Sequence, residues 1–213
     1  LIFDANSVFW LKGPFSEKDE VKSLGARWDK EKSKWFIPGG ASWTPFARWI
    51  PKEVLFLGVE TSGLPPSTYP PHECTKDYDV SRIVQLNAVL CDPSSNFTER
   101  GAVTAVIKSD GFPISNSQFH GITEEISQKK GVAFAAAAAQ LNKLLARKPM
   151  ILAHNSQFHV SILKAELYRY GLTDTLSSLL ECPVLCSMAS TKGALGLKDV
   201  GGNPKNPTLR ELY

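Results

Sequence analysis

Histidine and cysteine side chains, the usual ligands of zinc, occur in two short groups along the chain. His72 and Cys74 form one group, and Cys182 and Cys186 form the other. Four such side chains can hold zinc when the fold brings them together. We expect the alternative instead, in which Cys186 is a small buried residue and the Pro-rich loop around His72 is exposed. A cysteine nucleophile paired with a histidine has no supporting local signature either.

Tryptophan and basic residues stand side by side near the amino end. The basic residues beside Trp28 and Trp35 are Arg27, Lys30, Lys32 and Lys34. Rings that stack on bases and cations that contact phosphates are what a surface for single-stranded DNA or RNA needs. Tryptophan is also the usual core filler of very small domains, because an indole buries much area per residue. We expect the core role first and keep the stacking surface as the alternative.

The distribution of tryptophan divides the 213 residues into two modules, 1–53 and 54–213. All five tryptophans lie in the first module, namely Trp10, Trp28, Trp35, Trp43 and Trp49. For this module we expect a small α+β domain. Its predicted elements are a strand at 8–11, a helix from Ser16 to Leu24, a hairpin formed by 27–29 and 34–38, and a short helix at 43–50. Ser16 and Asp19 are expected to cap the first helix, and Gly25 is expected to end it.

The second module alternates strands and helices after an initial run of strands. Apolar runs predict strands at 54–57, 83–91, 102–107 and 150–153, with a turn over 58–63 after the first of them. Helical spacing and alanine content predict helices at 134–146 and 155–170. This order favours an α/β fold in which helices cover a mixed sheet.

Both modules carry stretches that resemble known families. Leu24–Asp29 and Lys34–Pro38 resemble a small domain of uncharacterised function that is often appended to primases, which implies a nucleic-acid setting but no catalytic residue. The second module resembles the DEDD-type 3′–5′ exonucleases of the ribonuclease H-like superfamily, close to the proofreading subunit of bacterial replicases. The stretches that carry this resemblance are Leu55–Gly63, Phe119–Thr123, His154–Leu163, Cys186–Met188 and Pro207–Tyr213.

The resemblance implies a fold and a set of site residues. The implied fold is a ribonuclease H-like mixed sheet flanked by helices. The implied chemistry uses two divalent metals, Mg²⁺ or Mn²⁺, held about 4 Å apart by carboxylates. The residues that match the first two family motifs outside the metal-binding Asp positions are Glu60, Thr61, His154, Asn155 and Phe158. Of these, Thr61, His154, Asn155 and Phe158 are candidates for nucleic-acid contact.

The departures from the family pattern fall on the metal ligands. Gly58 stands where the first motif has Asp, and His159 stands where the second motif has Asp, so Glu60 is the only acid left in these motifs. The third motif, with a general-base His and an Asp five residues later, would follow Tyr213. We expect no metal cofactor unless displaced acids such as Asp79, Asp92 or Asp174 take over.

Three hypotheses follow for the function. The first is a catalytically inactive exonuclease-like protein that acts as a binding or scaffolding subunit of a larger assembly, with other protein subunits and single-stranded DNA or RNA as candidate partners. The second is an active 3′–5′ exonuclease that uses Mg²⁺ or Mn²⁺. The third is a purely structural protein-contact subunit that binds no nucleic acid.

The composition adds only broad limits. A net charge of +3, from 24 basic and 21 acidic residues, identifies no partner by itself. No apolar run approaches the roughly 20 residues of a membrane span, so we expect no membrane insertion. Four irregularly spaced cysteines favour a reducing, intracellular compartment, without distinguishing nucleus, mitochondrion or plastid.

Overall fold

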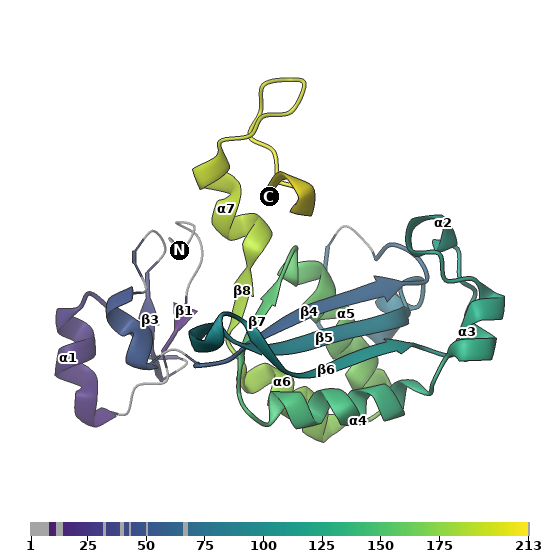
Figure 1. Cartoon of the computed structure of the whole chain (residues 1–213), viewed down its shortest axis with the longest axis horizontal. Coiled ribbons are helices and arrows are strands. Elements are labelled where there is room, and N and C mark those ends of the chain that lie inside the picture. The colour runs from purple at the N-terminus through teal and green to yellow at the C-terminus, as the bar shows by residue number, and fades with distance from the viewer. Residues whose placement is uncertain are drawn as a thin grey trace.

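The computed structural model describes residues 9–11, 15–31, 33–38, 41–42, 44–49, 51–65 and 68–212. They form two separate sheets, one of three strands near the amino end and one of five strands beyond it (Figure 1). Predictions that concern Val8, Lys32, Trp43, Ile50 and Tyr213 lie outside the described residues. None of the helices in the described ranges combines the length and the apolar character that a membrane crossing requires.

The three-stranded sheet contains the predicted hairpin. Strand β3 (Lys34–Ile37) lies in the middle, between β1 (Phe9–Trp10) and β2 (Arg27–Asp29), and both neighbours run antiparallel to it. Trp28 and Trp35 face each other across β2 and β3, with their rings edge to face and their centroids 5.3 Å apart. The hairpin prediction is therefore confirmed.

The helix before this hairpin begins later than predicted. Residues Phe15–Glu17 form a 3₁₀ turn, and the α-helix α1 spans Lys18–Ser23. The N-cap residue is Glu17, which makes no side-chain capping hydrogen bond, so the predicted cap at Ser16 is wrong. The reason is that Ser16 lies inside the 3₁₀ turn rather than at the end of an extended segment. Gly25, with φ +98°, turns the chain after the helix as expected.

A second short helix follows the hairpin. It is a 3₁₀ helix that spans Thr44–Trp49, and it turns Phe46 and Trp49 into the interior, where they are 2% and 4% exposed. These two rings pack with Val21, Trp35 and Ile37 in one apolar cluster. Three bulky rings, those of Trp35, Phe46 and Trp49, thus belong to the core of this small module.

The five-stranded sheet has the order β6-β5-β4-β7-β8. The central strand β4 is antiparallel to β5 and parallel to β7, which makes the sheet mixed. The strands are β4 (Val54–Thr61), β5 (Ile83–Asp92), β6 (Thr98–Val106), β7 (Met150–Ala153) and β8 (Val184–Cys186). The predicted fold, a mixed sheet flanked by helices, is confirmed.

Helices α4, α5 and α6 cover one face of this sheet (Figure 1). The α-helices of this part are α2 (Ser117–His120), α3 (Glu124–Lys130), α4 (Phe134–Leu145), α5 (Ser156–Arg169), α6 (Thr173–Glu181) and α7 (Ser187–Leu195), and short 3₁₀ helices span Thr75–Tyr78, Pro93–Ser95 and Leu209–Leu212. The main core lies between this helical layer and the alternate residues of the strands, such as Leu55, Leu57 and Val59 of β4.

The two sheets share an apolar contact. Leu185 of β8, which is 5% exposed, belongs to the same cluster as Trp35, Phe46 and Trp49, and Met150 and Leu152 of β7 pack against that cluster. The small sheet therefore lies against the β7–β8 end of the large one (Figure 1). Burial of side chains on both sides of this contact links the stability of the two parts.

Candidate functional site

The site suggested by the sequence lies at the carboxyl end of β4. The structure extends this strand through Thr61, so the turn predicted from Gly58 onward begins only at Ser62, because residues 58–61 continue to pair with β5. Alternation along the strand puts Val59 and Thr61 in the interior and leaves Glu60 exposed on the opposite face. A Cβ atom at Gly58 would meet nothing within 4 Å, so this position has room for a side chain that it does not carry.

His159 completes the hydrogen bonding of β4 where β7 has ended. The last β4–β7 pair joins Phe56 to Leu152, and three residues farther along β4 the backbone N–H of Val59 donates to Nδ1 of His159 at 3.1 Å. His159 lies in the first turn of α5. Because Nδ1 accepts this hydrogen bond, it carries no proton, and burial lowers the pKa of His159, so the ring is neutral near pH 7.

These residues do not fit a two-metal site of the kind that the resemblance implies. A neutral imidazole has one nitrogen lone pair to offer, and that of His159 already accepts the Val59 N–H. Gly58 offers no ligand at all, which leaves Glu60 as the one carboxylate of the two motifs. Among the described residues, no group of three or more His, Cys, Asp or Glu side chains is arranged to hold a metal ion.

Two of the three alternative ligands named from the sequence form ion pairs with arginines. Asp79 forms an ion pair with Arg169 at 2.6 Å, and Asp92 forms one with Arg100 at 2.9 Å. Hydrogen bonds from Ser94 and Arg100 hold the pKa of Asp92 well below its usual range. Asp174 lies in the first turn of α6.

The expected burial of Cys186 is met only in part, because this residue is half-buried, as is His72. Cys74 is exposed, whereas Cys182 is buried. The Sγ atom of Cys186 accepts the backbone N–H groups of Ser156 and Ala189, both at 3.4 Å, and these contacts place it between the starts of α5 and α7. No described residues complete a zinc-type cluster around any of them.

His154 and Asn155 form the turn between β7 and α5. Asn155 adopts a left-handed conformation, φ +64°, at the N-cap of α5. The carbonyl of Pro207 lies 3.0 Å from Nε2 of His154 and can only accept, so Nε2 donates to it, while Nδ1 lies 3.0 Å from the Ser187 hydroxyl. His154 therefore connects three separate segments, and its part in nucleic-acid contact stays a prediction.

Thr61 and His120 join two of the family-like stretches. Nε2 of His120 lies 3.2 Å from the carbonyl oxygen of Thr61, and its Nδ1 accepts the N–H of Ile122 at 3.1 Å. Thr61 is buried, and its hydroxyl donates to the carbonyl of Gly63 at 2.8 Å. Phe158 is half-buried against the main core. Thr61 and His120 hold the turn after β4, and the part of Thr61 and Phe158 in nucleic-acid contact stays a prediction.

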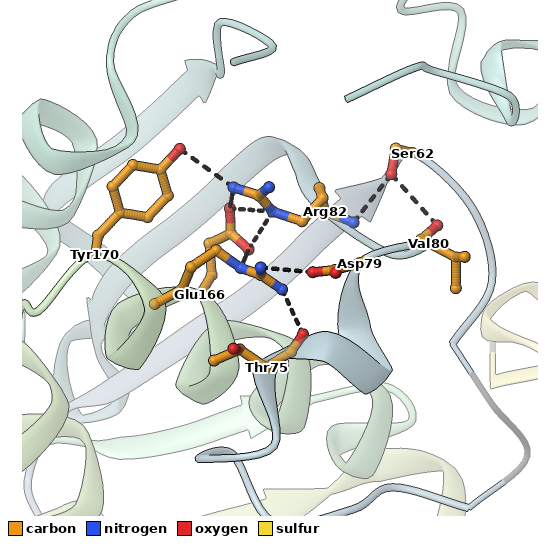
Figure 2. Close-up of polar contacts among 8 residues, drawn as sticks. Ser62, Thr75, Asp79, Val80, Arg82, Glu166 and Tyr170 are labelled. Atoms are coloured by element: carbon orange, nitrogen blue, oxygen red, sulfur yellow. Dashed lines mark hydrogen bonds and ion pairs between the residues drawn. The ribbon is translucent and has the colours of Figure 1, made fainter. Parts of the chain in front are cut away.

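Sequence reasoning missed a buried ion-pair network beside this turn, which Figure 2 shows. Nε and Nη2 of Arg82 donate to the carboxylate of Glu166 at 2.8–2.9 Å, and Nη2 also donates to the Tyr170 hydroxyl at 3.2 Å. Arg82 is 9% and Glu166 is 2% exposed. Burial disfavours both charges, but the hydrogen bonds and charge of Glu166 raise the pKa of Arg82, so the guanidinium stays charged.

The network holds the segment that follows β4 against α5. The backbone N–H of Arg82 donates to Oγ of Ser62 at 2.9 Å, and the N–H of Ser62 donates to the carbonyl of Arg82 at 2.8 Å. Next to Glu166, Arg169 reaches Asp79 and the carbonyl of Thr75 (Figure 2). Arg82 and Glu166 are 84 positions apart, so no local sequence signal could have found the pair.

The aromatic candidates near the amino end separate into one exposed and one buried ring. Trp28 is 41% exposed, whereas Trp35 is 8% exposed and belongs to the core. Arg27 is exposed, but it neighbours Trp28 along β2 and so points to the opposite face of the strand. The structure thus confirms the core role for Trp35 and leaves Trp28 as the ring that a base can reach.

Comparisons with known proteins show two separate likenesses. Residues 9–51 match the model of a domain of unknown function, DUF5710. Two Escherichia coli proteins named DNA primase TraC are 44% identical over 64 residues and 39% identical over 62 residues, which is 30% and 29% of this chain. These segments make up only 6% and 4% of the primases, so the chain spans a small part of these relatives.

The second likeness is to solved structures. A structure titled SSB/Exonuclease I in complex with inhibitor CFAM covers 72% of this chain at a TM-score of 0.55 and 20% identity. A moderately thermophilic Exonuclease I from Methylocaldum szegediense covers 74% of it at a TM-score of 0.53 and 18% identity. The matches take in 34% and 33% of those chains, about a third of their length. The chain thus combines a segment shared with DNA primase TraC and an α/β fold similar to that of Exonuclease I.

Proposed function

We propose that this protein is a catalytically inactive exonuclease-like protein that binds single-stranded nucleic acid as a subunit of a larger assembly. The proposal rests on the residues found at positions 58 and 159. Gly58 supplies no ligand, and the acceptor nitrogen of His159 is occupied by the backbone of Val59. The proposed partners are other protein subunits and single-stranded DNA or RNA, in a reducing intracellular compartment.

The loss of hydrolysis follows from the chemistry of hard cations. In enzymes of this fold, Mg²⁺ or Mn²⁺ would supply the positive charge around the scissile phosphate, and carboxylate oxygens would hold these ions. Changes even in residues that only orient metal ligands cost about 10- to 100-fold in metal affinity or activity. The absence of two ligand carboxylates costs more than that, so we expect Glu60 alone to hold no ion at physiological concentrations.

Retention of nucleic-acid binding is supported by different residues. Trp28 exposes an indole face on the segment related to DNA primase TraC. The fold is similar to that of Exonuclease I, and the turns after β4 and β7 keep the hydrogen bonds described above. None of these features depends on a metal. A protein of this kind can therefore lose catalysis and still bind single-stranded nucleic acid.

The proposal is tested first by measuring Mn²⁺ binding to the whole chain, by electron paramagnetic resonance of the free ion. We expect no saturable binding to the wild-type protein at micromolar Mn²⁺. The variant Gly58→Asp/His159→Asp is expected to gain a site, since Gly58 has room for a side chain. Tight binding to the wild-type protein that Glu60→Gln removes would contradict the proposal and favour the active-enzyme hypothesis.

The second test separates nucleic-acid binding from a purely structural role. Fluorescence anisotropy of a labelled single-stranded oligonucleotide should rise with protein concentration, and the affinity should fall as salt is raised. A flat titration at low salt would reject nucleic-acid binding and leave the protein-contact hypothesis.

A further inference from the structure

A cleft lies along α7, in the part of the chain that follows the last strand of the large sheet. Its volume is about 610 Å³, which is within the usual range for ligand sites. One wall comes from α7 and the other from the segment that returns after Gly196, where a left-handed conformation, φ +57°, ends the helix. The lining residues are Met188, Ala189, Lys192, Gly193, Gly196, Leu197, Lys198, Pro204 and Asn206.

The charge of this cleft is positive. Lys192 and Lys198 line it, no carboxylate occurs among its described lining residues, and neither lysine makes an ion pair with a described residue. Asp199 follows Lys198, but its carboxylate accepts the N–H groups of Gly201 and Asn203 within its own loop. Lys205, near the same loop, is paired with Glu211 at 2.7 Å. Lys192 and Lys198 are thus the cations available to an anionic ligand.

The rest of the lining is apolar, with one amide. Met188, Leu197 and Pro204 offer flat or flexible apolar surface, and Asn206 offers a donor and an acceptor. An apolar surface beside two ammonium groups is complementary to a nucleotide, whose base has apolar faces and whose phosphate is negatively charged. A simple inorganic anion would use only the lysines.

The cleft is connected to the candidate site at β4. His154 hydrogen-bonds to Ser187, the first residue of α7, and to the carbonyl of Pro207, the residue after Asn206. One imidazole therefore ties both walls of the cleft to the turn after β7. The same turn leads into α5, whose His159 contacts Val59 of β4.

We propose that this cleft holds a nucleotide of single-stranded nucleic acid, with its phosphate against Lys192 and Lys198 and its base against Met188, Leu197 and Pro204. The inference rests on the proposed function, because it names where that binding takes place. In this arrangement α7, rather than the end of β4 alone, is the main contact for the bound nucleic acid.

The test compares oligonucleotide binding of the whole chain with that of two double variants. Lys192→Ala/Lys198→Ala is expected to weaken binding by about tenfold and to lower the slope of log affinity against log salt by about 0.7, the contribution of one neutralised phosphate on a single strand. The matched control Lys129→Ala/Lys130→Ala removes two exposed cations from the end of α3 and should leave both values unchanged. Photocrosslinking from 4-thiothymidine should label a peptide within residues 188–206.

The outcomes are distinguishable. If the wild-type protein binds the oligonucleotide but the cleft variant binds it equally well, the cleft inference is wrong and the proposed function stands. If both double variants weaken binding equally, the cleft has no special role and the inference is again wrong. If the wild-type protein binds no oligonucleotide, the nucleic-acid part of the proposed function fails and the cleft inference fails with it.

Discussion

The backbone N–H of Val59 donates to Nδ1 of His159 across 3.1 Å, and this contact joins the central strand to the first turn of α5. At this place the resemblance to the exonucleases implies a carboxylate that faces a metal. The imidazole instead accepts a backbone hydrogen bond from β4 at a position beyond the last β4–β7 pair. The position thus has a part in the fold, and it carries an imidazole in place of the carboxylate that the resemblance implies.

The half-buried position of His159 predicts a pH dependence of stability. Burial lowers its pKa in the folded protein below the ordinary 6.5, so the unfolded chain takes up a proton first as the pH falls. Stability from this group is full above pH 6.5 and is lost as the pH drops through and below that value. We expect the urea midpoint of the wild-type protein to fall between pH 7.5 and pH 5.5, and this fall should be smaller for His159→Gln. Equal pH profiles would show that His159 is not the group involved.

The Arg82–Glu166 pair predicts a strong effect of removing one charge. Glu166→Leu leaves the Arg82 guanidinium buried without its partner, and such a change costs about 3–5 kcal/mol. The double variant Arg82→Leu/Glu166→Leu should recover part of this loss, because no unpaired charge remains. The measurement is the free energy of unfolding in guanidinium chloride. A double variant as unstable as the sum of the single variants would contradict a direct coupling.

The contact between the two sheets predicts that a change in β8 destabilises the amino-terminal module. Leu185→Ala removes a buried side chain from the cluster of Trp35, Phe46 and Trp49, at a cost of about 2–5 kcal/mol. Since all five tryptophans lie in residues 1–53, tryptophan fluorescence reports on that module. We expect its unfolding midpoint to shift in Leu185→Ala and to change little in Val184→Ala, which truncates a 37% exposed neighbour. An unshifted fluorescence transition in Leu185→Ala would mean that the modules unfold independently.

The exposure of Trp28 predicts a selective effect on nucleic-acid binding. A base stacked on an aromatic ring contributes about 1–3 kcal/mol, so Trp28→Ala should weaken oligonucleotide binding by about 5- to 150-fold. Trp28→Phe keeps a ring and should retain most of the affinity. Anisotropy titrations at one salt concentration provide the comparison. Unchanged affinity in Trp28→Ala, with the fold intact by circular dichroism, would remove this ring from the binding surface.

The sequence predicted the sheet because its signals are local. The runs at 83–91 and 150–153 gave β5 and β7 at or within one residue of their observed ends, whereas β4, predicted at 54–57, extends to Thr61. The helix α6 and the three-residue strand β8 were not predicted, since a short buried strand carries little periodicity of its own. The Ser16 cap failed because a 3₁₀ turn precedes α1.

The candidate site was predictable only where it resembles a known motif. Gly58, Glu60 and His159 were named from the sequence, but the hydrogen bond of His159 to Val59 spans 100 positions. The cleft beside α7 depends on the return of the chain after Gly196, which places Lys192 and Lys198 along one groove. Contacts of this kind arise from tertiary packing, and no spacing rule in a single sequence reports them.

The most direct test of the central claim is a nuclease assay on a single-stranded oligonucleotide labelled at its 3′ end, with the whole chain and either Mg²⁺ or Mn²⁺. The wild-type protein is predicted to release no more labelled nucleotide than the Glu60→Gln variant at matched concentration. Release by the wild-type protein that Glu60→Gln abolishes would contradict the account and identify the protein as an active exonuclease.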